Sequence, residues 1–198
     1  MDRTTESFFK LFPSQIHTQG PIGLALELRS RVAPAEIASL RIHTYRTALR
    51  SAATEPQKWN PQTRETADHS IPCLVAAAFH GGAITPDSFT SDRIQDPALC
   101  PLIAKMTIVE DPDFTRRFPQ EANCRMEVTT VSGQRFVAET VYPKGHQRNP
   151  LQDAEVDAKF RHLSHAVLPE AQCRTALDLL WSFEHVPNLR ALFASLVL

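Results

Sequence analysis

The chain has 198 residues, of which 42% are hydrophobic and 22% charged, with 21 basic and 22 acidic side chains. This hydrophobic content is typical of a folded globular protein and excludes a wholly disordered chain. The net charge of −1 excludes a globally basic nucleic-acid-binding protein, so we expect no nucleic-acid partner. We interpret residues 1–198 as a single domain, which at this length buries about 70% of its unfolded surface.

The cysteines and the N-terminal residues indicate a compartment. Cys73, Cys100, Cys124 and Cys173 are widely spaced and form no CxxC pair, the usual zinc or redox motif. The N-terminal residues are charged where a signal peptide would be apolar, and no apolar run approaches the ~20 residues of a membrane span. We therefore expect a cytoplasmic protein with reduced thiols, no membrane contact and no metal site.

The first part of the chain predicts a helix, a strand and a loop. Residues 17–32 are helical in pattern, and Pro34 ends the helix; its apolar face comprises Ile22, Ala25, Leu26 and Leu28. Apolar and polar residues alternate over 39–45, as in a strand. Turn-forming residues fill positions 54–61 and predict a polar loop.

The clearest predicted helix covers residues 71–80. Apolar residues recur there with helical spacing, at Ile71, Leu74, Val75, Ala78 and Phe79. Gly81 and Gly82 follow, as expected after a helix. A shorter helix is predicted over 96–105 and a short strand over 106–109.

The second half predicts a hairpin and then helices. Residues 124–130 alternate, Ser132-Gly133 supplies a turn, and 135–142 returns. Helical patterns follow Pro150 over residues 153–166, 170–183 and 189–196. Because strands and helices do not alternate strictly, we predict an α+β fold. Its small, mostly antiparallel sheet of about four strands would be covered by helices, with a helical C-terminal segment.

The densest polar cluster, residues 63–73, precedes an apolar helix. Ser70 is a natural N-cap, and free N–H groups in the first turn would favour an anion such as a substrate carboxylate. Cys73 would lie near the positive end of the helix, where the pKa of a thiol falls, and His69 lies four residues before it. The commoner alternative is an ordinary capped helix with a half-buried histidine and cysteine.

A second cluster occupies a loop bounded by glycine and proline at residues 142–150. Lys144, His146 and Arg148 could clamp a polycarboxylate there through charge-assisted hydrogen bonds. The alternative is a solvated loop that leads to the next helix.

The third cluster covers residues 9–17, just before the first helix. Lys10 lies between aromatic residues, where partial desolvation would depress its pKa, and His17 ends the cluster. The alternative is a lysine that extends its stem over apolar neighbours.

These pieces occur in a characteristic order over about residues 8–165. They are Phe9-Lys10-Leu11-Phe12-Pro13 with His17, Ala67-Asp68-His69-Ser70-Ile71-Pro72, Gly82-Ala83-Ile84-Thr85, the Ser132-Gly133 turn, Tyr142-Pro143-Lys144-Gly145-His146, Asn149-Pro150-Leu151 and Lys159-Phe160. Each piece alone is weak. The ordered set resembles the C-terminal half of the MmgE/PrpD family, which includes 2-methylcitrate dehydratases and cis-aconitate decarboxylases.

The resemblance implies a lyase of two parts that needs no cofactor. An all-helical N-terminal domain would contribute histidines and a lysine, and a C-terminal α+β domain would cover the cleft. The sequence contains no counterpart of the all-helical domain. We therefore expect a separate N-terminal half as partner, within a homo- or hetero-oligomer.

The resemblance also assigns expected roles to individual residues. Lys10 matches the active-site lysine of the family and is the expected catalytic residue. Four further residues are expected to bind substrate, namely His17, His69, Lys144 and His146. Cys73 stands where many relatives carry a tyrosine. Because a thiol is shorter and hydrogen-bonds weakly, the role of that tyrosine does not transfer to Cys73.

The leading hypothesis is the C-terminal lobe of a lyase for a small polycarboxylate, such as a methylcitrate or aconitate relative. The reaction would be proton abstraction beside a carboxylate with loss of water, or loss of CO₂ with protonation of the carbanion. We expect the isolated chain to be inactive. One alternative is a non-catalytic assembly or binding subunit, or a truncated remnant. Another is an epimerase or isomerase of the same superfamily.

Overall fold

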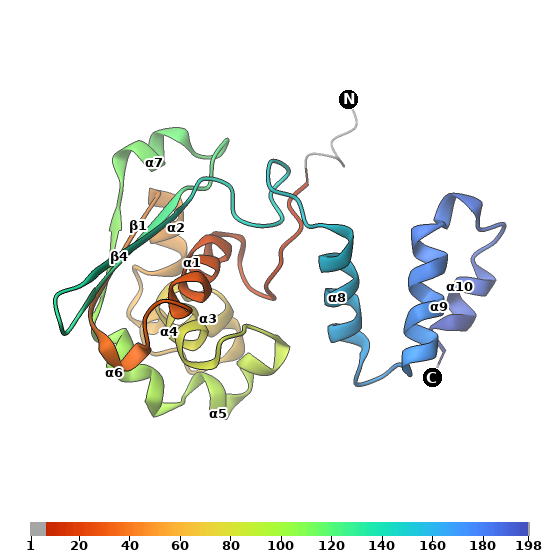
Figure 1. Cartoon of the computed structure of the whole chain (residues 1–198), viewed down its shortest axis with the longest axis horizontal. Coiled ribbons are helices and arrows are strands. Elements are labelled where there is room, and N and C mark those ends of the chain that lie inside the picture. The colour runs from red at the N-terminus through yellow and green to blue at the C-terminus, as the bar shows by residue number, and fades with distance from the viewer. Residues whose placement is uncertain (1–6, 198) are drawn as a thin grey trace. The chain divides into compact units, whose positions relative to one another are not determined.

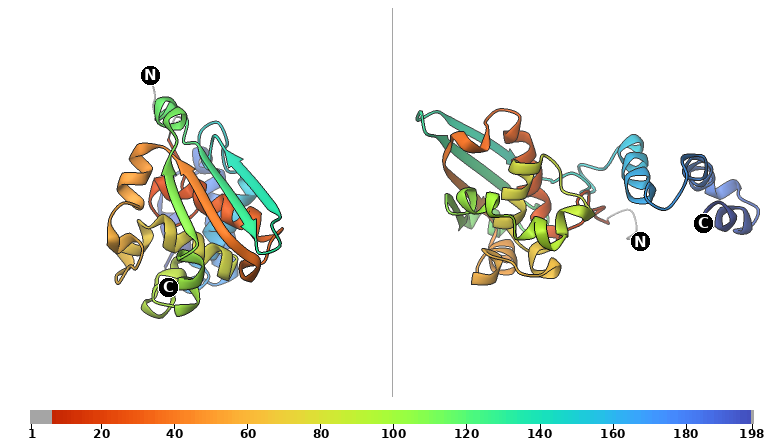
Figure 2. Two further views of the ribbon diagram at one scale, coloured as in Figure 1. Left: turned by 90° about the vertical axis from the view of Figure 1, so that its left-hand side faces the viewer. Right: turned by 90° about the horizontal axis from the view of Figure 1, so that it is seen from below.

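In the computed structural model, which describes residues 7–197, four strands of the described chain form one mixed sheet in the order β2-β1-β3-β4 (Figure 2, left). The strands are β1 (Ile37–Thr44), β2 (Met106–Glu110), β3 (Cys124–Thr130) and β4 (Arg135–Thr140). β1 pairs in parallel with β2 and antiparallel with β3, and β3 pairs antiparallel with β4. The predicted α+β fold with a small, mostly antiparallel sheet is confirmed.

Alternation along the strands separates a buried from a more exposed face of the sheet. In β3, Cys124, Met126, Val128 and Thr130 are buried, and the residues between them are less so. Ile42 of β1 lies opposite Met126, so apolar side chains of neighbouring strands meet on one face. Gly133 adopts a φ of 84° in the turn of the predicted hairpin, which is confirmed.

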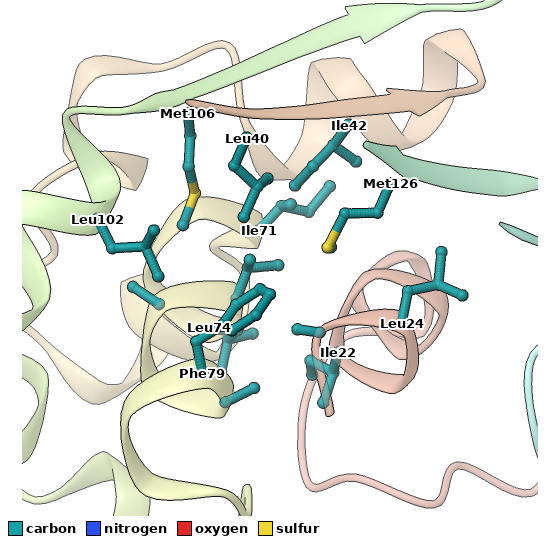
Figure 3. Close-up of a cluster of buried hydrophobic side chains, with 14 of the residues drawn as sticks. Ile22, Leu24, Leu40, Ile42, Ile71, Leu74, Phe79, Leu102, Met106 and Met126 are labelled. Atoms are coloured by element: carbon teal, nitrogen blue, oxygen red, sulfur yellow. The ribbon is translucent and has the colours of Figure 1, made fainter. Parts of the chain in front are cut away.

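Two apolar helices cover the buried face. α1 (Gln19–Arg29) packs against β3, β4 and α4 (Ile71–Gly81). Figure 3 shows side chains of the sheet and of these helices directed toward one another, among them Leu40, Met126, Ile22 and Phe79. Gly82 ends α4 in the left-handed conformation, with a φ of 74°, as its position predicted.

Shorter elements connect these parts (Figure 1). The helices are α2 (Arg46–Ala52), α3 (Arg64–Asp68), α5 (Ser91–Ile94), α6 (Cys100–Ile103) and α7 (Pro112–Arg117). The 3-10 helices of this part are η2 (Ile16–Thr18), η3 (Pro34–Glu36), η4 (Pro56–Lys58), η5 (Pro86–Phe89) and η6 (Pro97–Leu99). The sequence pattern does not predict α2, α3, α5 or α7, because these helices are too short for a clear apolar period.

Several predicted boundaries are wrong, among them the following three. The helix predicted over 96–105 is divided into η6 and α6, because Pro101 lacks the N–H that a continuous helix would use there. The first helix begins at Gln19 rather than residue 17, after the 3-10 turn η2. The first strand ends at Thr44, and Tyr45 is the N-cap of α2.

The chain divides into two compact units, Met1–Pro150 and Leu151–Leu198, and each is described by itself. The second unit contains α8 (Asp153–Ser164), α9 (Glu170–Trp181), η7 (Phe183–His185) and α10 (Arg190–Ser195), so the helical C-terminal segment is confirmed. The single-domain interpretation of residues 1–198 stays a prediction. Within residues 7–197 no helix is long and apolar enough to cross a membrane.

Candidate functional site

Two backbone hydrogen bonds hold the segment before α1 against distant parts of the chain. The N–H of Phe9 donates to the carbonyl oxygen of Gly145 at 2.9 Å. The N–H of Gln15 donates to the carbonyl oxygen of Asp68, also at 2.9 Å. These bonds join residues 8–18, which we call the lysine segment, to the loop after β4 and to the end of α3. The three clusters singled out in the sequence therefore meet in the fold.

The contact between Phe9 and Gly145 requires a glycine. Gly145 has a φ of 93°, and a Cβ atom added to it would lie 1.8 Å from the carbonyl oxygen of Phe9. Its own N–H donates to the carbonyl oxygen of Asn149 at 2.9 Å, which closes the loop. Only a residue without a side chain allows this approach of two backbones.

Gln19, in the first turn of α1, holds the shape of the lysine segment. Its Oε1 accepts a hydrogen bond from the N–H of Phe12 at 3.0 Å, and its Nε2 donates to the carbonyl oxygen of Phe12 at 3.1 Å. Nε2 also donates to the hydroxyl of Ser14 at 3.1 Å. The side chain is 2% exposed. Gln19 was not among the residues singled out from the sequence. The feature that could have indicated it is a lone glutamine at the start of an apolar helix.

A hollow of about 390 Å³, which we call the lysine hollow, lies beside this segment and is open to solvent. Its lining comprises Phe8, Lys10, Pro13, Ser14, Gln15, Ile16, Asp68 and His69. Nδ1 of His69 hydrogen-bonds the Asp68 carboxylate and lies 3.1 Å from the carbonyl oxygen of Glu65. Lys10 is exposed, so the partial desolvation expected from its aromatic neighbours is wrong.

An adjoining hollow of about 250 Å³, which we call the aromatic hollow, shares Phe8 and Ile16 with the lysine hollow. The rest of its lining comprises His17, Tyr45, Phe118, Pro119, Ala122, His146 and Gln147. The rings of Tyr45 and Phe118 stack with their centroids 4.3 Å apart and their planes at 12°. Four predicted residues, Lys10, His69, His17 and His146, therefore line two neighbouring hollows.

His17 is held by Tyr45, a residue that the sequence analysis did not assign to the site. Nδ1 of His17 lies 2.7 Å from the Tyr45 hydroxyl, and the two rings meet edge-on at 5.5 Å. Burial lowers the pKa of His17, because an imidazolium loses hydration there. Burial raises the pKa of Tyr45, so its hydroxyl keeps its proton. The pair is neutral near pH 7.

His146 is fixed by its own loop. The N–H of Arg148 donates to Nδ1 of His146 at 3.0 Å, so the neutral ring carries its proton on Nε2. The ring packs against Tyr142 at 4.8 Å and meets Phe8 edge-on at 5.8 Å. Burial and the nearby charge of Arg148 both lower the pKa of His146.

Two predicted residues lie elsewhere. Lys144 lines a third hollow of about 200 Å³, between α1 and the end of β4, together with Leu11 and Glu27. Cys73 is 3% exposed within the hydrophobic core. Burial raises its pKa to about 12, so the lowered thiol pKa expected at the start of a helix is wrong. Loss of hydration outweighs the helix dipole for a buried thiolate.

The start of α4 is a closed cap. The hydroxyl oxygen of Ser70 accepts a hydrogen bond from the N–H of Cys73 at 3.0 Å, as its position predicted, and the hydroxyl donates to the carbonyl oxygen of Lys58. Pro72 has no backbone N–H. In the first turn of α4, the N–H of Cys73 is therefore already bonded and residue 72 offers no donor, which disfavours the anion site suggested for this turn.

No group of three His, Cys, Asp or Glu side chains within the described part of the chain could hold a metal ion. The titratable groups among the described lining residues of the two hollows are one lysine, one aspartate, one tyrosine and three histidines. Such groups can bind carboxylates and move protons.

Comparison with known proteins identifies a family and several relatives. The model of the MmgE/PrpD C-terminal domain matches residues 12–183. A 2-methylcitrate dehydratase from Cupriavidus necator is 29% identical over 147 residues, which is 69% of this chain and 30% of that protein. A cis-aconitate decarboxylase from Mus musculus is 26% identical over 174 residues, or 87% of this chain and 35% of that protein.

A third relative, from Yarrowia lipolytica, is a mitochondrial 2-methylcitrate dehydratase that is 28% identical over 182 residues. The match covers 85% of this chain and 34% of that protein. The chain thus spans about a third of the length of these curated relatives.

Proposed function

Because the chain belongs to the MmgE/PrpD family, as a C-terminal domain, we propose that it forms one lobe of a lyase for a small polycarboxylate. The relatives named above are a dehydratase and a decarboxylase of such acids. The observation that carries the proposal is the meeting of Lys10 and His69 at the lysine hollow, beside His17 and His146.

The proposed chemistry begins with a carboxylate beside Lys10 and His69. In a dehydration, a base removes the proton next to a carboxylate and the hydroxyl leaves as water. In a decarboxylation, the C–C bond to a carboxylate breaks and CO₂ leaves. The bonding electrons stay on the substrate carbon, and an acid protonates this carbanion. Lys10 would stabilise the developing negative charge or transfer the proton, which typically contributes about 10²–10⁴-fold in rate. His69 would orient the carboxylates, and His17 and His146, in the adjoining hollow, would contact the rest of the substrate.

The proposal includes a second lobe. The lysine hollow is open, Lys10 is exposed, and 38% of the His69 side chain is exposed. Proton transfer and charge stabilisation are more effective where water is excluded. We therefore propose that an all-helical domain of the family closes the site, within a homo- or hetero-oligomer.

The experiment compares the chain alone with the chain co-expressed with an all-helical MmgE/PrpD domain. Loss of 2-methylcitrate or cis-aconitate and release of CO₂ are followed by mass spectrometry. We expect no turnover by the chain alone and turnover by the co-purified pair. Turnover by the chain alone would refute the need for a second lobe. A co-purified pair that leaves both acids unchanged would refute a lyase function on these two acids.

Lys10→Met in the active pair tests the role of Lys10. We expect kcat to fall by about 10²-fold or more, because a group that acts in the transition state is removed. Lys58→Met is the matched control, since Lys58 is half-buried on η4 and lines neither hollow. Equal activity of the two variants would exclude Lys10 from catalysis.

A further inference from the structure

The two adjoining hollows differ in charge. The lysine hollow contains Lys10, Asp68 and His69. None of the described residues that line the aromatic hollow is an Asp, Glu, Lys or Arg. Burial lowers the pKa of its two histidines, His17 and His146, and the nearby charge of Arg148 adds to this at His146, so both favour the neutral form. A carboxylate in the aromatic hollow would lose hydration and meet no Lys or Arg in the described lining, and an apolar group would not have this cost.

The walls of the aromatic hollow are arranged in advance. Tyr45 is 3% exposed, stacks on Phe118 and contacts His17 through its hydroxyl. The ring of Phe8, also in the lining, meets the ring of His146 edge-on. An apolar ligand group that enters such a hollow meets aromatic faces and edges without reorganising them, which favours binding.

The aromatic hollow has room for a group larger than methyl. An apolar cavity of about 150 Å³ is enough to hold a benzene molecule. The aromatic hollow measures about 250 Å³. A methyl group would leave most of this space to water, whereas a phenyl or branched alkyl group would displace it.

We propose that the aromatic hollow is a subsite for an apolar substituent of the carboxylate substrate, larger than a methyl group. The substrate then spans Phe8 and Ile16, which border both hollows, with its carboxylates at Lys10 and His69. This inference rests on the proposed function, because that function places the carboxylates in the lysine hollow.

The test is a titration of the isotope-labelled 198-residue chain with succinate, 2-methylsuccinate and 2-benzylsuccinate, followed by NMR. We expect 2-benzylsuccinate to bind about tenfold or more tightly than succinate, with 2-methylsuccinate close to succinate. The benzyl ring should shift the ring signals of His17 and Tyr45, and succinate should shift mainly the side-chain signals of Lys10 and His69. Equal affinities, or ring shifts away from the aromatic hollow, overturn the inference.

A variant that fills the hollow gives a second test. Ala122→Leu places a larger side chain in the aromatic hollow and should remove the preference for 2-benzylsuccinate while leaving succinate binding unchanged. Ala83→Leu is the matched control, because Ala83 lines a separate hollow after α4. The amide spectrum of each variant shows whether it folds. If Ala122→Leu does not fold, the shifts of the His17 and Tyr45 ring signals in the wild-type chain still test whether the aromatic hollow binds the benzyl group.

The outcomes separate this inference from the proposed function. Tighter binding of 2-benzylsuccinate at His17 and Tyr45, together with a co-purified pair that leaves both acids unchanged, supports the subsite and refutes a lyase function on these two acids. Turnover by the pair without any preference for 2-benzylsuccinate refutes the subsite and supports the lyase.

Discussion

The backbone N–H of Phe9 and the carbonyl oxygen of Gly145 are joined by a hydrogen bond of 2.9 Å. The two residues are far apart in the sequence, yet each is next to a residue of the candidate site. Phe9 precedes Lys10, and Gly145 precedes His146. This single backbone contact therefore sets the lysine hollow and the aromatic hollow side by side.

Gly145→Ala should detach the lysine segment from its loop. The new Cβ would lie 1.8 Å from the Phe9 carbonyl oxygen, and a φ of 93° is unfavourable for alanine. We expect the free energy of unfolding to fall by about 2–3 kcal/mol in urea titrations, with faster hydrogen exchange at the Phe9 amide.

Gly133→Ala is the control for that substitution. Gly133 has a similar φ of 84°, but an added Cβ would meet nothing within 4 Å. It should therefore cost only the backbone strain, about 1 kcal/mol. Equal destabilisation by the two variants would show that the Phe9 contact is not what Gly145 provides.

Gln19→Ala should loosen the lysine segment without breaking α1. The change removes the hydrogen bonds of the Gln19 side chain to Phe12 and Ser14 and leaves buried polar groups without these partners. We expect a loss of about 2–3 kcal/mol in the free energy of unfolding and faster exchange of the Phe12 amide. Gln62→Ala, at an exposed loop position, should change neither measurement. An unaltered Phe12 exchange rate in Gln19→Ala would rule out this role.

Stability should fall on mild acidification. The pKa values of His17, His43 and His146 are lowered in the folded chain, so in the unfolded chain these groups bind protons at higher pH, near their usual pKa of about 6.5. Their contribution to stability is complete above that pH and is lost as the pH falls through the lowered values. We expect the urea midpoint to decrease between about pH 7.5 and about pH 5.

Replacing one of these histidines measures how much it contributes to the pH dependence of stability. His17→Gln should make the urea midpoint less dependent on pH, because one group that protonates on unfolding is gone. His185→Gln, at an exposed position in η7, should leave the dependence as in the wild type. A urea midpoint that depends more steeply on pH in His17→Gln than in the wild type would contradict a lowered pKa of His17 in the folded chain.

The four cysteines should differ in alkylation rate. Cys100 is exposed, and Cys73, Cys124 and Cys173 are buried. Burial raises the pKa of Cys73 to about 12, so little thiolate forms there at about pH 8. With iodoacetamide and mass spectrometry, we expect one fast thiol in the native chain and four after denaturation. Labelling of Cys73 as fast as Cys100 would restore a nucleophilic role for Cys73.

The sequence predicted the parts of the fold that repeat a clear period. The apolar stripe of α4 and the alternation of β3 are each long enough to distinguish helix from strand. The short helices α2 and α7 escaped prediction because a helix of one or two turns shows no full apolar stripe. Tertiary contacts stabilise such elements, as in the packing of Tyr45, Ala48 and Phe114.

Local sequence also determined the three clusters and their chemical types, since residue identity and spacing are properties of the chain. The tertiary structure decided which of them meet. Gly145 joins the lysine segment to the loop of His146, whereas burial assigns Cys73 to the core and raises its pKa. Hydration and distance depend on every element packed around a group, and neither can be read from its neighbours in the sequence.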